Sequence, residues 1–209
     1  MKLIKRLIFL IIIVGAFLAG GTVYKAMDMY HEAIEETPIS QKVIEIRSME
    51  HYTAYSQLPE TYVNAVIAVE DRRFEYHKGI DLISLGRAIV ANIKGGELTE
   101  GGSTITQQLA RNMYFEQDKE ISRKIAEMFI ALEIEKEYDK DEIFELYANV
   151  IYFGSGYYGI YDASQGYFDK SPIMLNDYEC TMLAGIPQAP SVYSLDENPD
   201  LADFKMPST

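Results

Sequence analysis

The stretch AVEDRRFEYHKGID, residues 68–81, contains the carboxylate pair best suited to chemistry, Glu70 and Asp71. Glu70 directly follows Val69 at the end of a predicted apolar helix face, so we expect its carboxyl group to be partly removed from water. Burial raises the pKa of a carboxyl group and suits it to accept a proton as a general base. The competing interpretation is an ordinary solvated helix end, and these residues alone do not decide between the two.

A second group of polar side chains lies on the helix predicted for STITQQLARNMYF, residues 103–115. Ser103 or Thr104 can cap this helix, and Thr104 with Gln107 fits a capping box. Such a face suits the binding of hydroxyls, amides and phosphate, whereas the alternative is a plain solvated face. The four residues that share it at the spacing i, i+3, i+4, i+7 are Thr104, Gln107, Gln108 and Arg111.

A third group lies in ISRKIAEMF, residues 121–129, where Arg123 and Lys124 precede Glu127 by four and three residues. This spacing brings a cation and a carboxylate together on a helix surface. Taken alone, it predicts an exposed salt bridge worth only a few tenths of a kcal/mol.

Three other patterns give no site. The glycine-rich GELTEGGS, residues 96–103, approaches a phosphate-binding loop, but Gly102 stands where lysine is needed and no strand precedes it. The three histidines, at positions 31, 51 and 77, have no metal-ligand spacing, so we expect His77 to fix the loop after the first motif by packing or hydrogen bonding. Cys180 is the single cysteine, which excludes an internal disulfide, and we expect it to be buried.

Helical periodicity must supply the framework for these groups. Helices are predicted from Pro59 into the first motif, over 80–93, over 119–138, over KDEIFELYANVIYFG (140–154), and in a short piece that Gly185 and Pro187 end. The helix at 119–138 is expected to turn one apolar stripe inward, made of Ile121, Ile125, Met128 and Leu132. No run of alternating strands and no repeat is present, so the predicted fold class is all-α, with a mobile loop at KGGELTEGG, residues 94–102.

The N-terminal 24 residues predict a membrane anchor. Residues 7–24 carry no charge, and a helix of that length rises about 27 Å, close to the hydrocarbon thickness of a bilayer. The basic residues Lys2, Lys5 and Arg6 place the N-terminus in the cytoplasm. The alternative is a cleaved signal peptide, whose apolar run is usually shorter. The polar residues 25–54 are predicted to form a stalk or linker.

The chain has 209 residues and a net charge of −13. Its length suits one outer domain, and its charge argues against nucleic acid as a partner. An anionic ligand must therefore be met by a local cluster of Lys and Arg.

The motifs EDRRFEYHKGID, GGSTITQQLARN, RKIAE and KDEIFELYANVIYFG follow one another in an order and spacing that resemble the peptidoglycan glycosyltransferases. This is glycosyltransferase family 51, found in class A penicillin-binding proteins and monofunctional biosynthetic transglycosylases. The resemblance covers about residues 55–200. It implies a lysozyme-like, two-lobed domain at 55–209, with a head and a jaw lobe at about 82–99, behind the transmembrane helix.

The resemblance also implies an activity and a set of site residues. The enzyme would polymerise lipid II into glycan strands with inversion at the donor sugar, releasing undecaprenyl pyrophosphate. The implied catalytic residues are Glu70 and Glu127. The implied substrate-binding residues are Asp71, Phe74, His77, Gly79, Ser103, Thr104, Gln107, Gln108, Arg111, Asn112, Arg123 and Lys124.

Further expectations concern cofactors, partners and location. The resemblance requires no cofactor but allows a divalent metal, Mg or Mn, at the donor pyrophosphate. The implied partners are lipid II, the growing lipid-linked glycan, the outer leaflet of the membrane and cell-wall synthesis proteins. The implied location is the plasma membrane, with a single pass and an extracytoplasmic catalytic domain.

Some features depart from the family pattern. The ending NPDLADFKMPST lacks the expected basic helix, and YFDK stands where YFGK is usual. Neither S-x-x-K nor K-T-G occurs, so we expect no transpeptidase domain in this sequence, as in a monofunctional enzyme, although an isolated N-terminal part of a larger protein would fit as well. The competing functions are a lysozyme-like hydrolase or lytic transglycosylase, and a scaffold subunit of a cell-wall complex that has lost activity.

Overall fold

The computed structural model describes residues 2–95, 101–115 and 120–188. Within these ranges the secondary structure is helical, and the one β-type contact is an isolated antiparallel bridge between Tyr152 and Tyr158. The predicted all-α fold class is therefore confirmed. The predicted glycine-rich loop and the unusual C-terminal ending lie largely or wholly outside the described residues.

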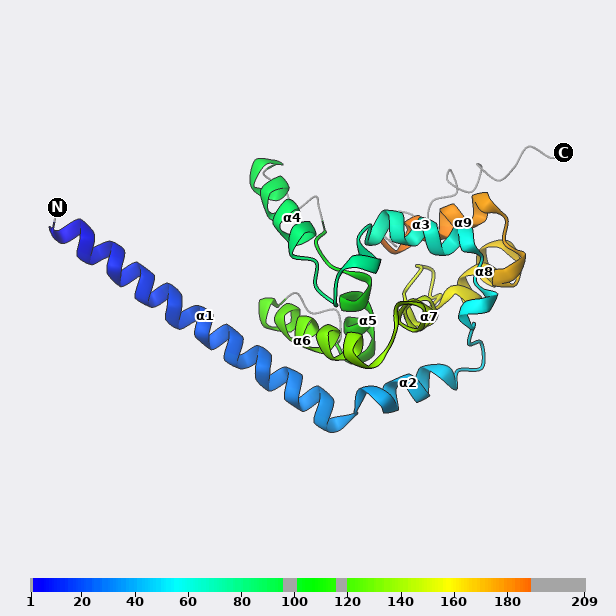
Figure 1. The fold of residues 1–209 in the computed structure, drawn as a ribbon, viewed down its shortest axis with the longest axis horizontal. Coiled ribbons are helices and arrows are strands. Elements are labelled where there is room, and N and C mark those ends of the chain that lie inside the picture. Colours follow the sequence, from blue (N-terminus) through cyan, green and yellow to red (C-terminus); the bar gives the residue numbers. More distant parts are fainter. Residues whose placement is uncertain (1, 96–100, 116–119, 189–209) are drawn as a thin grey trace.

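The helices follow the order shown in Figure 1. The α-helices are α1 (Lys2–Glu36), α2 (Ile39–Arg47), α3 (Glu60–Glu70), α4 (Leu82–Gly95), α5 (Ile105–Tyr114), α6 (Ile121–Glu137), α7 (Lys140–Val150), α8 (Ile160–Phe168) and α9 (Asp177–Gly185). Short 3-10 helices are η1 (Tyr55–Gln57), η2 (Phe74–Tyr76), η3 (Pro172–Met174) and η4 (Ile186–Gln188).

Local capping sets the start of three helices. The predicted capping box of Thr104 and Gln107 is present at α5: Gln107 N donates to Thr104 Oγ1 at 3.1 Å and Thr104 N donates to Gln107 Oε1 at 3.0 Å. The same reciprocal arrangement begins α7 at Asp139 and α9 at Asn176. These caps fix where each helix starts, because they satisfy N–H groups that have no partner inside the helix.

The centre of the hydrophobic core is α7. Its residues Ile143, Phe144, Leu146 and Tyr147 are at most 1% exposed. The Phe144 ring lies near the rings of Tyr62 and Phe74, at centroid distances of 6.1 and 6.4 Å. Helix α5 packs between α6 and α7, while α3 packs on α9. The functional motifs therefore project from helices that share one core.

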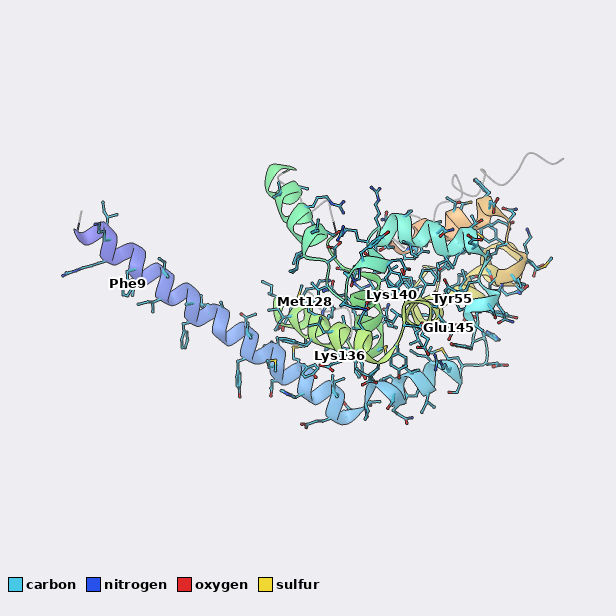
Figure 2. The ribbon with its side chains drawn as sticks, in the orientation of Figure 1. Phe9, Tyr55, Met128, Lys136, Lys140 and Glu145 are labelled. Carbon is cyan, nitrogen blue, oxygen red and sulfur yellow. The ribbon has the colours of Figure 1, made fainter. Side chains whose placement is uncertain are left out.

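The N-terminal region contains the predicted apolar helix but differs from the predicted stalk. Helix α1 continues without a break through Glu36, and it is long and apolar enough by length and composition to cross a membrane. Figure 2 shows Phe9 projecting from the part of α1 that lies away from the other helices. The next helix, α2, buries Ile39, Val43 and Ile46 in the core. The polar residues between these apolar positions led to the stalk prediction, but an i, i+4, i+7 spacing gives α2 a buried face.

The predicted inward stripe of α6 is also wrong. Ile121 is 75% exposed, and the buried side of the helix is instead formed by Ala126, Glu127, Ile130, Ala131 and Ile134. The small side chains of the two alanines permit close packing of another helix on this side, and Glu127 is buried because it has charged partners. The apolar stripe therefore identified the helix but not its buried face.

Helix α4 stands apart from the other helices in Figure 1, on the side where the N-terminal part of α1 extends. It carries three exposed large apolar residues, Leu82, Ile83 and Val90. It coincides with most of the predicted jaw segment at 82–99, of which residues 96–99 lie outside the described residues.

Candidate active site

Glu70 lies at the last position of α3 and is largely buried. Its Oε2 accepts a hydrogen bond of 2.6 Å from Gln108 Nε2, while its Oε1 is buried and has no hydrogen-bond partner among the described residues. Burial raises the pKa of the Glu70 carboxyl group, and Asp71 adds to this, although Gln108 and Arg111 oppose the shift. The predicted partial desolvation is therefore confirmed, and the group has the properties of a general base.

The residues after Glu70 form a buried support. Asp71 Oδ2 accepts hydrogen bonds from His77 Nε2 at 2.8 Å and from the backbone N–H of Ile105 at 3.0 Å. His77 Nδ1 lies 3.2 Å from the N–H of Gly79, which donates to it. His77 is thus assigned as the tautomer with its proton on Nε2. The expectation that His77 fixes this loop by hydrogen bonding is confirmed.

The polar face of α5 is buried rather than solvated. Thr104, Gln107 and Gln108 are between 1% and 8% exposed. Thr104 Oγ1 donates to the carbonyl oxygen of Gly79 at 2.7 Å, which joins the start of α5 to the loop after Glu70. The alternative of a plain solvated face is excluded, because each of these side chains has a specific partner inside the domain.

A cation cluster forms where α6 begins. Arg123 donates to Glu127 Oε1, Lys124 Nζ lies 3.3 Å from Glu127 Oε2, and Lys124 also donates to Ser103 Oγ. Glu127 is 1% exposed, so the expectation of an exposed salt bridge is wrong. The i, i+4 spacing predicted the pairing but not the burial. Because Arg123 and Lys124 both pair with this one buried carboxylate, their charged groups are held close together.

Arg111 connects the cation cluster with Glu70. Its charge acts on the Glu70 carboxyl group and also on the Lys124 ammonium group. Burial, together with repulsion from Arg111 and Arg123, lowers the pKa of Lys124 to about 8, although Glu127 lies close to Nζ. Three cations and one raised-pKa carboxyl group therefore belong to one electrostatic site.

A cavity of about 310 Å³ opens beside Glu70. Predicted site residues in its wall are Glu70, Asp71, Ser103 and Thr104. Sequence reasoning missed other wall residues, namely Val69, Arg72, Ser84, Arg87, Gly101, Gly102 and Gln188. Arg72 belongs to the first motif and its charge was a usable signal, whereas Ser84 and Gln188 reach the cavity through tertiary packing that no local pattern encodes.

The other predicted substrate-binding residues are not in this cavity wall, and two of them, Asn112 and Phe74, also lie outside the support, α5 face and cation cluster described above. Asn112 is exposed and lines a different cavity of about 420 Å³, together with His51, Asn149 and Tyr161. One residue advances a helix by about 100°, so the neighbour of Arg111 faces another side of α5. Phe74 is 1% exposed and packs in the core. Asn112 is therefore not brought to the cavity beside Glu70, and Phe74 supports the motif from within.

The described residues hold no preformed set of protein ligands for a divalent metal. No group of three or more His, Cys, Asp or Glu side chains gathers among the described residues. Glu127, the carboxylate that would serve as a ligand, is already bound by Arg123 and Lys124. Because the cluster itself supplies positive charge to an anionic ligand, we derive no step through a metal ion.

Taken together, the arrangement suits group transfer with an anionic leaving group. Glu70 can accept a proton from a hydroxyl group in the cavity, and the side chains of Arg111, Arg123 and Lys124 can stabilise negative charge on the departing group.

Comparison with known proteins is consistent with this chemistry. Residues 36–207 match the family model described as Transglycosylase. The match starts at residue 36, so it includes α2 and begins before the domain start predicted at 55. Penicillin-binding protein 1F of Bacillus subtilis is 40% identical over 215 residues, which cover 95% of this chain and 30% of that protein. A Cupriavidus necator protein named as a transglycosylase is 42% identical over 194 residues, covering 93% of this chain and 80% of that protein.

Penicillin-binding protein 1A of Aquifex aeolicus is 43% identical over 151 residues, which cover 72% of this chain and 21% of that protein. The chain thus spans less than a third of both penicillin-binding proteins and most of the Cupriavidus protein.

Proposed function

The chain belongs to the transglycosylase family, and from this premise we propose that it is a peptidoglycan glycosyltransferase that polymerises lipid II into glycan strands. The observation that carries the proposal is that Glu70 and Ser103 line one cavity, and Ser103 accepts a hydrogen bond from Lys124 of the cation cluster. A glycosyl transfer from a pyrophosphate-linked donor needs both parts, a base for the acceptor and positive charge for the leaving group.

In the proposed reaction, Glu70 takes the proton of the acceptor's GlcNAc 4-hydroxyl group. The hydroxyl oxygen forms a bond to C1 of the donor MurNAc as the bond from C1 to the pyrophosphate oxygen breaks. The configuration at C1 inverts, and undecaprenyl pyrophosphate leaves with the bonding electron pair. Gln108 holds the Glu70 carboxylate from one side through Oε2, and the raised pKa makes the group a better proton acceptor near neutral pH.

The donor pyrophosphate is assigned to Arg111, Arg123 and Lys124, with the Ser103 hydroxyl group beside Lys124. Glu127 forms ion pairs with both Arg123 and Lys124 and is shielded from solvent, so it can hold these two side chains in place. Charge-assisted hydrogen bonds from these groups would be stronger to the departing pyrophosphate than to the bound donor, because its negative charge grows in the transition state.

The proposed setting is the outer face of the plasma membrane. Helix α1 would span the bilayer with its basic N-terminus in the cytoplasm, and the exposed Leu82, Ile83 and Val90 of α4 would enter the outer leaflet as the jaw. Both features would present the cavity to a lipid-linked substrate. We further propose that the protein works alongside other cell-wall synthesis proteins.

The main rivals are a glycan hydrolase or lytic transglycosylase, and an inactive scaffold. A hydrolase also uses a cleft carboxylic acid. It has no pyrophosphate to bind, however, so the buried Arg123–Glu127–Lys124 cluster favours the transferase.

The test is the full-length chain in vesicles that contain lipid II, with polymer length followed on gels. We expect the wild type to form glycan strands and Glu70→Gln to lose about 10²–10⁴-fold in rate, the range for loss of general acid–base catalysis. Because burial raises the pKa of Glu70, its charged form is disfavoured in the fold, so Glu70→Gln should not melt below the wild type at neutral pH.

Arg123→Ala serves as the companion variant and should lower kcat for lipid II, because Arg123 is proposed to bind the departing pyrophosphate more strongly than the bound donor. Degradation of finished glycan, with no polymer from lipid II, would identify a hydrolase. Polymer formation by Glu70→Gln at the wild-type rate would remove Glu70 from the mechanism.

A further inference from the structure

A buried ion pair outside the cavity joins three helices. The side chain of Glu135, near the end of α6, is 3% exposed. Its Oε1 accepts a hydrogen bond of 2.6 Å from Lys140 Nζ, at the start of α7, and one of 2.7 Å from Thr106 Oγ1, in the first turn of α5. Figure 2 shows Lys140 near the middle of the domain, where these helices lie together. The reaction proposed above assigns no role to any of the three side chains.

One side of this ion pair reaches the helix that holds Gln108. Thr106 is fully buried and follows Ile105, whose N–H donates to Asp71 Oδ2 at 3.0 Å. Two residues after Thr106, Gln108 donates to Glu70 at 2.6 Å. The bond from Thr106 to Glu135 therefore fixes the turn of α5 that contacts both members of the carboxylate pair.

The other side reaches the loop after Glu70. Glu135 Oε1 lies 4.0 Å from His77 Nδ1, and the opposite nitrogen of His77 donates to Asp71 at 2.8 Å. Lys140 Nζ lies 4.4 Å from the centroid of the Phe74 ring, a cation–π distance. The ion pair thus contacts the loop and the helix that meet at Glu70.

We propose that Glu135 and Lys140 are positioning residues for glycosyl transfer, holding the first turn of α5 and the loop Asp71–Gly79 in the register in which Gln108 contacts Glu70. The inference rests on the proposed function, in which Glu70 is the base. Neither residue meets substrate. Lys124 lies eleven residues before Glu135, about 16 Å along α6, so the cations of α6 that are assigned to the pyrophosphate are far from the ion pair. A small displacement of a catalytic group lowers the rate of the chemical step with little effect on binding.

The test measures kcat and KM for lipid II on the full-length chain. Glu135→Gln keeps an acceptor oxygen for Thr106 but removes the charge that pairs with Lys140. We expect kcat to fall about tenfold while KM stays within about twofold. Lys140→Met should have a similar effect. The double variant should recover most of the lost kcat, because residues in direct contact couple and neither side then leaves a buried charge unpaired.

Glu145→Gln is the matched control. Glu145 is also a carboxylate on a helix of the core, and it accepts hydrogen bonds from the Tyr52 hydroxyl and from the N–H of Tyr55, the latter at 2.6 Å. Figure 2 labels Glu145 and Tyr55 next to each other. It should lose a comparable amount of thermal stability yet keep kcat. Thr106→Val, which removes one hydroxyl group, gives a milder variant and should lower kcat about threefold even if Glu135→Gln does not fold.

Three results would overturn the proposal: a kcat for Glu135→Gln or Thr106→Val equal to that of Glu145→Gln, a rise in KM proportional to the loss of kcat/KM, or a double variant worse than either single one. These outcomes leave the proposed function intact, since the wild type still polymerises lipid II. A wild type that forms no polymer contradicts the proposed function and, with it, this inference.

Discussion

Lys124 is a site residue whose charge should change at mildly alkaline pH. Burial and the neighbouring cations lower its pKa to about 8, so it loses its proton within an accessible pH range. In the proposed reaction, the charged form is the one that would bind the donor pyrophosphate. As pH rises through about 8, the free enzyme loses this charge, and kcat/KM should fall on the alkaline side.

The check is the pH profile of kcat/KM for lipid II polymerisation by wild type and Lys124→Arg. An arginine remains charged throughout the range, so its profile should lack the alkaline fall near pH 8. Its absolute activity should be lower by about tenfold or less, because the guanidinium group does not reproduce the ammonium contact with Ser103. An unchanged alkaline limb would assign that titration to another group.

Individual residues also show what local sequence can reveal. The apolar run before Glu70 predicted its desolvation, and the position of His77 after the motif predicted its role in the loop. The burial of Glu127 could not be predicted, because i, i+4 spacing reports a pairing and not the helix face that becomes buried. Glu135 gave no signal at all, since its partners come from two other helices.

At the scale of elements, the loop after Glu70 depends on Gly79. This residue has φ +86°, and a Cβ atom there would lie 2.8 Å from the backbone oxygen of Ala131 on α6. Its own carbonyl oxygen accepts the hydrogen bond from Thr104 that ties the loop to α5. The conformation and the close approach both require glycine.

Gly79→Ala should therefore lower the free energy of unfolding by about 1–3 kcal/mol and reduce polymerisation, because the loop must move away from α6 and from the cap of α5. Gly86→Ala is the control in chemical denaturation. Gly86 lies inside α4, where an added Cβ atom would have open space around it, so alanine there should be neutral or stabilise by up to about 1 kcal/mol. Equal stability of the two variants would contradict the argument.

Helices were predictable where caps and periodicity agreed, as at α5 with Thr104 and Gln107 and at α7 with its inward Ile143, Leu146 and Tyr147. Prediction failed where apolar residues were sparse or abundant on two sides. In α2, the three buried residues are separated by polar ones. In α6, the side that becomes buried carries two alanines and a paired carboxylate, and the stripe of larger apolar residues is not the buried side. Only packing partners decide such cases.

At the scale of the whole molecule, α1 connects the predicted membrane segment directly to the folded domain. Beyond the apolar part, Ala26 is fully buried and the Tyr30 ring lies 5.9 Å from that of Phe129 on α6. Lys25 Nζ lies 2.6 Å from Glu120 Oε2, at the residue that precedes α6. Since α6 carries the cation cluster, an unbroken α1 would hold that cluster at a set height above the bilayer.

Two truncated proteins separate anchoring from packing. A protein that starts at Lys25 keeps the part of α1 that packs on α6, so its free energy of unfolding in urea should match a detergent-solubilised full-length chain while vesicle binding falls. A protein that starts at Pro38 also loses Ala26, Tyr30, Ala33 and Ile34, which pack at the core. Because these side chains are at least partly buried in the longer protein, their loss should lower the free energy of unfolding of the shorter protein by about 2 kcal/mol or more. Equal stability of the two truncated proteins would mean that residues 25–36 of α1 only tether the domain and do not contribute to its stability.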